Sequence, residues 1–204
     1  MVGSTADAQP GGSANPAVGV GFKMDDYELA LTAFNKVIQH QKQYPRSKVR
    51  DAYLRMGDAE FALSRFWPAM EQYNKSISMS PAQSDYALYQ KSISYGFVDR
   101  NKQKIKSLKE LIEKHPKSPF VEDAFFELSS AYSVANSFDT AISTYDKMIQ
   151  RYPKSPYVPK AILNKALILY NQEQLIRAEG VLRNLVVRYT NDPVAQQALG
   201  TLKE

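Results

Sequence analysis

Residue types that carry enzyme chemistry are scarce in this chain of 204 residues. Cysteine is absent, which excludes thiol catalysis and disulfides, and the two histidines, His40 and His115, lie far apart in the sequence. Neither histidine belongs to a spaced set of ligands of the kind that holds a metal ion. The sequence also lacks a glycine-rich phosphate loop and a GxSxG nucleophile motif. We therefore expect a protein that is not an enzyme and needs no metal and no cofactor.

The composition is that of a folded chain without a membrane span. Hydrophobic residues make up 44% of the chain and aromatic residues 11%, which is ordinary for a protein with a packed core. No run approaches the roughly 18 apolar residues that a membrane-spanning helix needs. The N-terminus does not combine a basic start with an apolar core, so it does not read as an intact signal peptide.

The net charge of +5 is concentrated in residues 100–117, where seven basic side chains stand against two acidic ones. The possible basic patch consists of Arg100, Lys102, Lys104, Lys106 and Lys109. Such a patch could bind nucleic acid or an anionic membrane. Apolar residues at helical spacing run through the same window, however, and it offers no obvious aromatic side chains for stacking on bases. The favoured interpretation is a solvated helix face.

The elements that must position any site are helices in repeated pairs. In residues 115–156, apolar residues recur at spacings of three and four on both sides of Asn136-Ser137, which predicts two amphipathic helices. Alanine marks one place in the first helix of successive pairs every 35 to 37 residues, at Ala52, Ala87, Ala124, Ala161 and Ala198. Prolines between the pairs keep nearly the same period, at Pro45, Pro81, Pro116 and Pro153. A constant period with two helices per unit is typical of an α-solenoid.

The order of residues within a pair resembles the tetratricopeptide repeat. The matching positions in one unit are Phe125, Leu128, Ser129, Tyr132, Phe138, Ala141, Tyr145 and Pro153. In an earlier unit they are Tyr53, Met56, Gly57, Phe66, Ala69, Tyr73 and Pro81. The linker phrases KHPKSPFVEDA and RYPKSPYVPKA are similar to repeats of bacterial cell-envelope proteins, such as outer-membrane assembly lipoproteins of the BamD type and the Tol-associated periplasmic coordinator. The resemblance implies an all-α, right-handed α-α superhelix and a location in the periplasm or cell envelope rather than the cytoplasm.

The repeat register divides the chain into segments. Residues 1–24 are rich in glycine and proline and are expected to be a flexible arm or an expression scar. The expected solenoid, residues 25–204, consists of a half repeat at 25–44, full repeats at 45–80, 81–115, 116–152 and 153–190, and a half repeat at 191–204. Half repeats at both ends favour a fragment of a longer array over a chain whose last helix is a cap. In the third unit Lys104 replaces the small residue at the helix crossing, so the helices there should splay or the lysine should point outward.

A tetratricopeptide superhelix lines its concave side with the first helix of each pair. By register, the outward groove positions are Leu54, Asp58, Phe61, Tyr86, Tyr89, Ile93, Asp123, Phe126, Ser130, Lys160, Leu163, Leu167 and Tyr170. Exposed apolar positions of this kind usually mark a partner site. We expect the aromatic members Phe61, Tyr86, Tyr89, Phe126 and Tyr170 to act as anchors. Lys160 is the one basic residue in this set, so the carboxylate clamp of chaperone-binding relatives has no support.

The sequence favours a non-catalytic scaffold that binds a peptide or helix of a protein partner in the concave groove. A second hypothesis is an envelope assembly or structural module that stacks on neighbouring repeats or self-associates through the solenoid ends, at residues 27–38 and 194–202. A third, less favoured hypothesis is nucleic-acid or anionic-membrane binding through residues 100–117. The sequence does not identify the partner.

Overall fold

The computed structural model describes residues 23–201, and every regular element in that range is helical. The α-helices are α1 (Met24–Gln39), α2 (Arg46–Ala62), α3 (Phe66–Met79), α4 (Asp85–Phe97), α5 (Asn101–Lys114), α6 (Val121–Val134), α7 (Phe138–Arg151), α8 (Val158–Asn171), α9 (Leu175–Arg188) and α10 (Pro193–Thr201). Short 3-10 helices follow α1 and α3, at Gln41–Gln43 and Pro81–Gln83. The predicted all-α content is thus confirmed for these residues. The predicted N-terminal arm lies almost wholly outside them.

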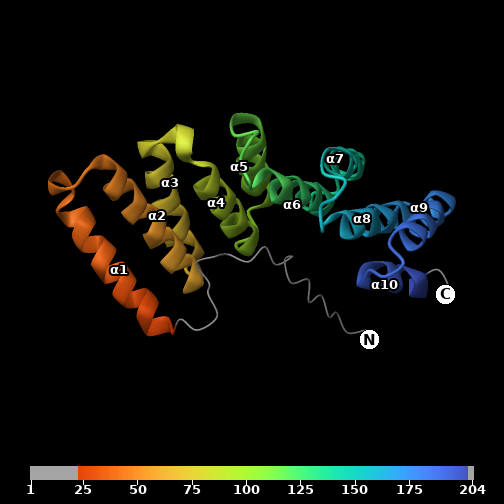
Figure 1. Ribbon diagram of the computed structural model, residues 1–204, viewed down its shortest axis with the longest axis horizontal. Coiled ribbons are helices and arrows are strands. Elements are labelled where there is room, and N and C mark those ends of the chain that lie inside the picture. The colour runs from red at the N-terminus through yellow and green to blue at the C-terminus, as the bar shows by residue number, and fades with distance from the viewer. Residues whose placement is uncertain (1–22, 202–204) are drawn as a thin grey trace. The chain divides into compact units, whose positions relative to one another are not determined.

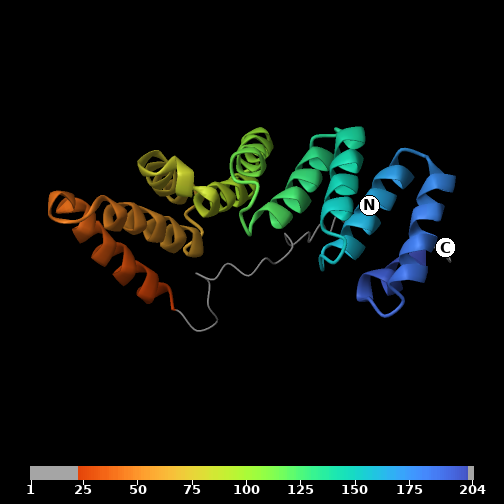
Figure 2. The same ribbon diagram turned by 45° about the horizontal axis from the view of Figure 1, so that its top comes forward.

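The helices form two compact units, unit 1 up to Met79 and unit 2 from Ser80 onward. In unit 1, helix α2 packs against both α1 and α3. In unit 2, α4 pairs with α5, α6 with α7 and α8 with α9, while α10 lies against α8 and α9. These pairs can be followed along the colour ramp in Figure 1, and Figure 2 shows the later pairs side by side. The predicted two-helix repeat is therefore visible inside each unit.

The turn inside each helix pair has a recurring backbone shape. In the described range, four non-glycine residues adopt positive φ angles. Each of them lies in such a turn: Ser64 (58°), Asp99 (54°), Asn136 (55°) and Glu173 (58°). The next residue then donates its N–H to a carbonyl near the end of the first helix, as Arg100 does to Tyr95 and Ser137 to Tyr132, both at 2.9 Å. This is the Schellman geometry that ends helices in a left-handed residue. It fixes the length of the turn without glycine.

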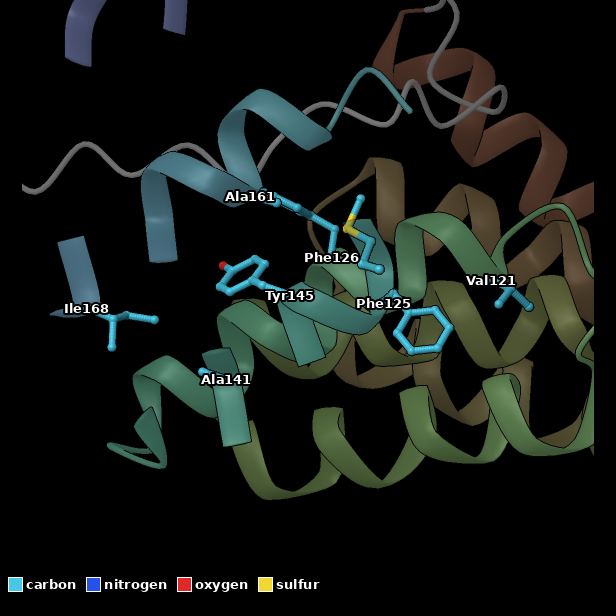
Figure 3. Close-up of a cluster of buried hydrophobic side chains, with 8 residues drawn as sticks. Val121, Phe125, Phe126, Ala141, Tyr145, Ala161 and Ile168 are labelled. Atoms are coloured by element: carbon cyan, nitrogen blue, oxygen red, sulfur yellow. The ribbon is translucent and has the colours of Figure 1, made fainter. Parts of the chain in front are cut away.

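The core of unit 2 runs from one helix pair into the next. One buried cluster joins α6, α7 and α8 through Val121, Phe125, Phe126, Ala141, Tyr145, Met148, Ala161 and Ile168, and Figure 3 draws these side chains as sticks. The marker alanines at the helix crossings, among them Ala124, Ala141 and Ala161, are fully buried because the backbones approach closely there. Ala161 and Ile168 of this cluster come from α8, so an isolated α6–α7 pair would leave part of the apolar cluster in water, and the pairs stabilise one another.

Lys104 lies inside the repeat stack. Its ammonium group is 2.6 Å from Oε2 of Glu127 on α6, and the two side chains are only 13% and 9% exposed. A Cβ added to Gly96 on α4 would lie 3.4 Å from the lysine Nζ, about van der Waals contact, so the Lys104 side chain packs across this glycine. The expectation that Lys104 points outward is wrong, because a carboxylate on the next first helix satisfies its charge. Helices α4 and α5 stay packed around it.

Helix α1 is held to unit 1 more loosely than the other helices of that unit. None of its residues is fully buried. Arg65, at the turn before α3, pairs with Glu28 on α1 and lies 3.6 Å from Glu60 on α2. Burial raises the pKa of Glu60, and the nearby Arg65 charge works against that shift. A half-buried apolar face and one bridging arginine therefore fix this helix.

The glycines of α2 and α9 should respond oppositely to the same substitution. A Cβ at Gly57 would lie 2.6 Å from Cε1 of Tyr73. The tyrosine is fully buried, and its hydroxyl donates to Asp58 at 3.0 Å, so the ring has no room to move away. We expect Gly57→Ala to lower the free energy of unfolding by about 1–3 kcal/mol, as overpacking does.

Gly180→Ala is the matched control, since a Cβ there meets no atom within 4 Å. It should raise the free energy of unfolding by about 0.5–1 kcal/mol through helix propensity alone. Urea unfolding followed by circular dichroism measures both changes. A Gly57→Ala protein as stable as the parent would contradict the described packing of Tyr73.

Candidate functional site

The linkers before α6 and α8 each cover an aromatic residue of the preceding first helix. Phe120 stacks on Tyr89 of α4, with ring centroids 5.5 Å apart and planes 17° apart. Tyr157 stacks in the same way on Phe126 of α6, at 5.2 Å and 24°. Tyr89 and Phe126 are consequently only 5% and 4% exposed. The expectation that they are exposed anchors is wrong, because the next linker fills the space a partner would need.

Two charged residues of the predicted groove belong to the same junction. Burial raises the pKa of Tyr157, and its hydrogen bond to Asp123 and the charge of that carboxylate raise it further. The ammonium of Lys160 lies 5.6 Å from the centroid of the Phe126 ring. Asp123 and Lys160 therefore support the stacked pair, which limits their contact with a partner.

The other predicted groove residues differ in exposure. Asp58 is buried. Its carboxylate accepts a hydrogen bond from the hydroxyl of Tyr73, and its Oδ2 lies 3.2 Å from Nη1 of Arg55. Leu163 is also buried, in a cluster with Leu182 and Leu185. The half-buried members are Leu54, Phe61, Tyr86, Ile93 and Ser130, together with Asp123 and Lys160. Leu167 and Tyr170, at 42% and 58% exposed, present the largest apolar surface among them.

A pocket of about 240 Å³ opens between α6, α7 and α8, and we call it the α6–α8 pocket. Its lining consists of Ser130, Ser133 and Val134 from α6, Tyr145 from α7, and Asn164, Leu167, Ile168 and Asn171 from α8. Tyr145 and Ile168 also belong to the buried cluster drawn in Figure 3. Two of the predicted groove residues, Ser130 and Leu167, are thus brought together here.

The floor of the α6–α8 pocket is a neutral hydrogen-bonded group. The side-chain amide of Asn164 donates to the hydroxyl of Tyr145 at 3.0 Å, and the hydroxyl of Ser130 lies 3.3 Å from the same oxygen. Burial raises the pKa of Tyr145, so its hydroxyl stays protonated at neutral pH. Val134, Leu167 and Ile168 supply the aliphatic part of the lining, and Val134 is 73% exposed. Every lining residue in the described range is uncharged, so binding here would use hydrogen bonds and apolar contact.

Sequence reasoning missed the amides of this pocket. Asn164 and Asn171 lie seven residues apart on α8, which places them on one face of the helix with Leu167 between them. That spacing was the available signal. Tyr145 is one of the positions that match the repeat, and its side chain is 1% exposed. The register alone did not show that its hydroxyl reaches the pocket.

The predicted basic patch is smaller than the sequence suggests. Arg100, Lys102, Lys106 and Lys109 are exposed along α5, whereas Lys104 is paired inside the stack. Nearby Lys91 is partly buried, which lowers its pKa, and its ammonium lies 5.7 Å from the centroid of the Tyr95 ring. The exposed lysines form one face of α5.

Residues 23–201 contain neither a candidate membrane span nor a candidate metal cluster. Among these residues, no helix combines the length and apolar character needed to cross a membrane. The same range contains no cluster of three or more His, Cys, Asp or Glu side chains that could hold a metal ion.

The matched sequence family agrees with the observed helix pairs. Residues 123–155 match the family described as tetratricopeptide repeat. The chain carries a tetratricopeptide repeat. The matched stretch covers most of α6, all of α7 and the start of the following linker, and so includes the pair that forms the pocket with α8. No curated protein sequence matches the chain.

Solved structures of similar fold extend the likeness beyond this one repeat. The crystal structure of MamA protein has a TM-score of 0.69 and 19% identity, covering 81% of this chain and 84% of its own. YrrB, described as a TPR protein with an unusual peptide-binding site, has a TM-score of 0.67 and 15% identity, with 86% and 84% covered. A tetratricopeptide repeat protein from Parabacteroides merdae has a TM-score of 0.71 and 14% identity, with 87% and 66% covered. At such identities the likeness concerns the fold, and it confirms the predicted α-α superhelix class.

Breaking the buried ion pair between repeats should be costly. Lys104→Met removes the only partner that the structure gives to the buried Glu127 carboxylate within residues 23–201. We expect a loss of about 3–5 kcal/mol in the free energy of unfolding, because an uncompensated charge stays behind. Replacing both residues in Lys104→Met/Glu127→Met should recover most of that loss.

Lys106→Met, on the exposed face of the same helix, is the control and should change stability by less than about 0.5 kcal/mol. Thermal and urea unfolding of the parent and of these three variants measure the changes in stability. Equal stability of Lys104→Met and Lys106→Met would show that the pair does not join α5 to α6 in solution.

Proposed function

We propose that this chain is a non-catalytic interaction scaffold that holds a peptide segment of a partner protein against the α6–α8 pocket. The observation that carries the proposal is the pocket itself, with its polar floor and with Val134 and Leu167 exposed at its rim. Tetratricopeptide repeats generally act as protein-interaction scaffolds, which agrees with this use. The peptide-binding site named for YrrB, a protein of similar fold, supports the same class of ligand.

The exposed apolar area supports weak, reversible binding. Val134, Leu167 and Tyr170 are more than two-fifths exposed. Fully covering a side chain that starts exposed contributes roughly 1.5–3 kcal/mol. Three such contacts give at most about 4.5–9 kcal/mol, from which the cost of ordering the ligand is subtracted. The apolar contacts alone thus correspond to about millimolar binding or weaker, and hydrogen bonds in the pocket must add to them.

A second candidate is an assembly module that self-associates through the solenoid ends. Met24 and Leu29 on α1 are more than two-thirds exposed, which favours a contact for this helix. Sedimentation that depends on protein concentration, and that disappears in Leu29→Lys, would support it. A periplasmic or envelope location and anionic ligands for α5 stay predictions from the sequence.

The test of the scaffold proposal uses a random peptide library displayed on phage and panned against the whole chain. Selected peptides are synthesised with a fluorophore and titrated by polarisation. Leu167→Lys/Tyr170→Glu should weaken their binding by about 10- to 100-fold, because charges replace the apolar surface of Leu167 in the pocket lining and of Tyr170, which follows it by three residues on α8. Circular dichroism must show that the variant stays folded.

The matched control is Ile176→Lys/Val187→Glu on α9. These residues are 88% and 75% exposed and lie outside the pocket lining, so binding should stay within about twofold of the parent. Equal weakening by both double variants would contradict the proposal, as would a library that yields no binding peptide.

A further inference from the structure

The hydrogen-bonding groups of the α6–α8 pocket are incompletely used. Asn164 donates one N–H to Tyr145, while no other described residue bonds its carbonyl oxygen or its second N–H. Within residues 23–201, Asn171 makes no side-chain hydrogen bond at all. A side-chain amide offers two donors and one acceptor. Both asparagines therefore present donors and acceptors toward the pocket that they line.

The spacing of the two amides suits an extended chain. Seven residues along a helix correspond to a rise of about 10.5 Å. An extended polypeptide rises about 3.3 Å per residue, so about three of its residues span that distance. Leu167 and Ile168 lie between the two asparagines, and Val134 faces them from α6. A ligand bonded to both amides would thus pass over an aliphatic surface.

The lack of charge in the lining restricts the ligand further. A buried carboxylate or ammonium group needs a paired opposite charge, and its desolvation is costly without one. The lining supplies hydroxyls, amides and aliphatic groups. Main-chain peptide groups, with one donor and one acceptor each, match the asparagines without bringing charge.

We infer that the α6–α8 pocket binds an uncharged, internal stretch of extended polypeptide from a partner protein, with main-chain amides bonded to Asn164 and Asn171 and one aliphatic side chain seated in the pocket. This inference rests on the proposed function and specifies its ligand. A free chain terminus is excluded from the pocket because its carboxylate would meet no cation there. An acidic or basic side chain is excluded for the same reason.

The experiment uses the peptides selected by phage display, made with acetylated and amidated ends. A second set ends in a free carboxylate directly after the aliphatic residue that tolerates substitution least. The amidated peptides should bind at least about tenfold more tightly than the second set, because the lining offers no partner for the charge. Replacing that aliphatic residue by Asp or Lys should cause a similar loss.

Two protein variants address the amides. Asn164→Asp and Asn171→Asp keep the side-chain shape, remove both donors and place a charge against the peptide. The fold should tolerate the first change, since Tyr73 in unit 1 already donates to an aspartate, Asp58. Each variant should bind the amidated peptides about tenfold more weakly or worse. Asn184→Asp, on an exposed part of α9 outside the lining, is the matched control and should bind like the parent.

The outcomes separate this inference from the scaffold proposal. Peptides that lose affinity in Leu167→Lys/Tyr170→Glu but bind both aspartate variants normally would overturn the inference and leave the proposed function standing. A requirement for a free carboxylate or a charged side chain would do the same. Peptides that bind Leu167→Lys/Tyr170→Glu as tightly as the parent would overturn both the inference and the proposed function.

Discussion

Unit 2 depends on the contact between each helix pair and the first helix of the next pair. Before α6 and before α8 the contact has three parts: a small residue at the helix crossing, a stacked aromatic pair to which the linker contributes one ring, and a polar side chain that bonds to the preceding second helix. Between α5 and α6, Glu127 forms an ion pair with Lys104. Between α7 and α8, the side-chain amide of Asn164 donates a hydrogen bond to the hydroxyl of Tyr145. Because a single pair cannot bury its own apolar faces, these junctions decide which residues remain available on the surface.

The same tyrosine position gives the two units different surface chemistry. In unit 1 the hydroxyl of Tyr73 donates to Asp58, which also pairs with Arg55, so the polar groups satisfy one another. In unit 2 the equivalent Tyr145 meets Ser130 and Asn164, which are neutral and keep hydrogen-bonding capacity. Unit 1 places the carboxylate of Asp58 against the tyrosine hydroxyl, whereas unit 2 places the hydroxyl of Ser130 and the amide of Asn164 there. The group in unit 2 is therefore neutral and can still form hydrogen bonds with a ligand. This difference is the reason to place the peptide at the α6–α8 pocket.

Much of the fold could be predicted from the period of alanines and prolines, because helix crossings require small residues at fixed intervals. The burial of Tyr89 and Phe126 could not be predicted in this way. It depends on the path of the linkers through Phe120 and Tyr157, which a helical register does not describe. The role of Lys104 depends in the same way on a partner 23 residues later in the chain. The seven-residue spacing of Asn164 and Asn171 on α8 can be read from the sequence. That both side chains line a pocket with Tyr145 is shown only by the structure.

The most direct measurement is a nuclear magnetic resonance titration of the isotopically labelled chain with an amidated peptide from the display selection. The side-chain amide signals of Asn164 and Asn171 report on the pocket alone. The account predicts that these signals shift together with the backbone amides around Leu167, in proportion to the bound fraction. Unchanged Asn164 and Asn171 signals, with shifts confined to α1, α5 or α9, would contradict it.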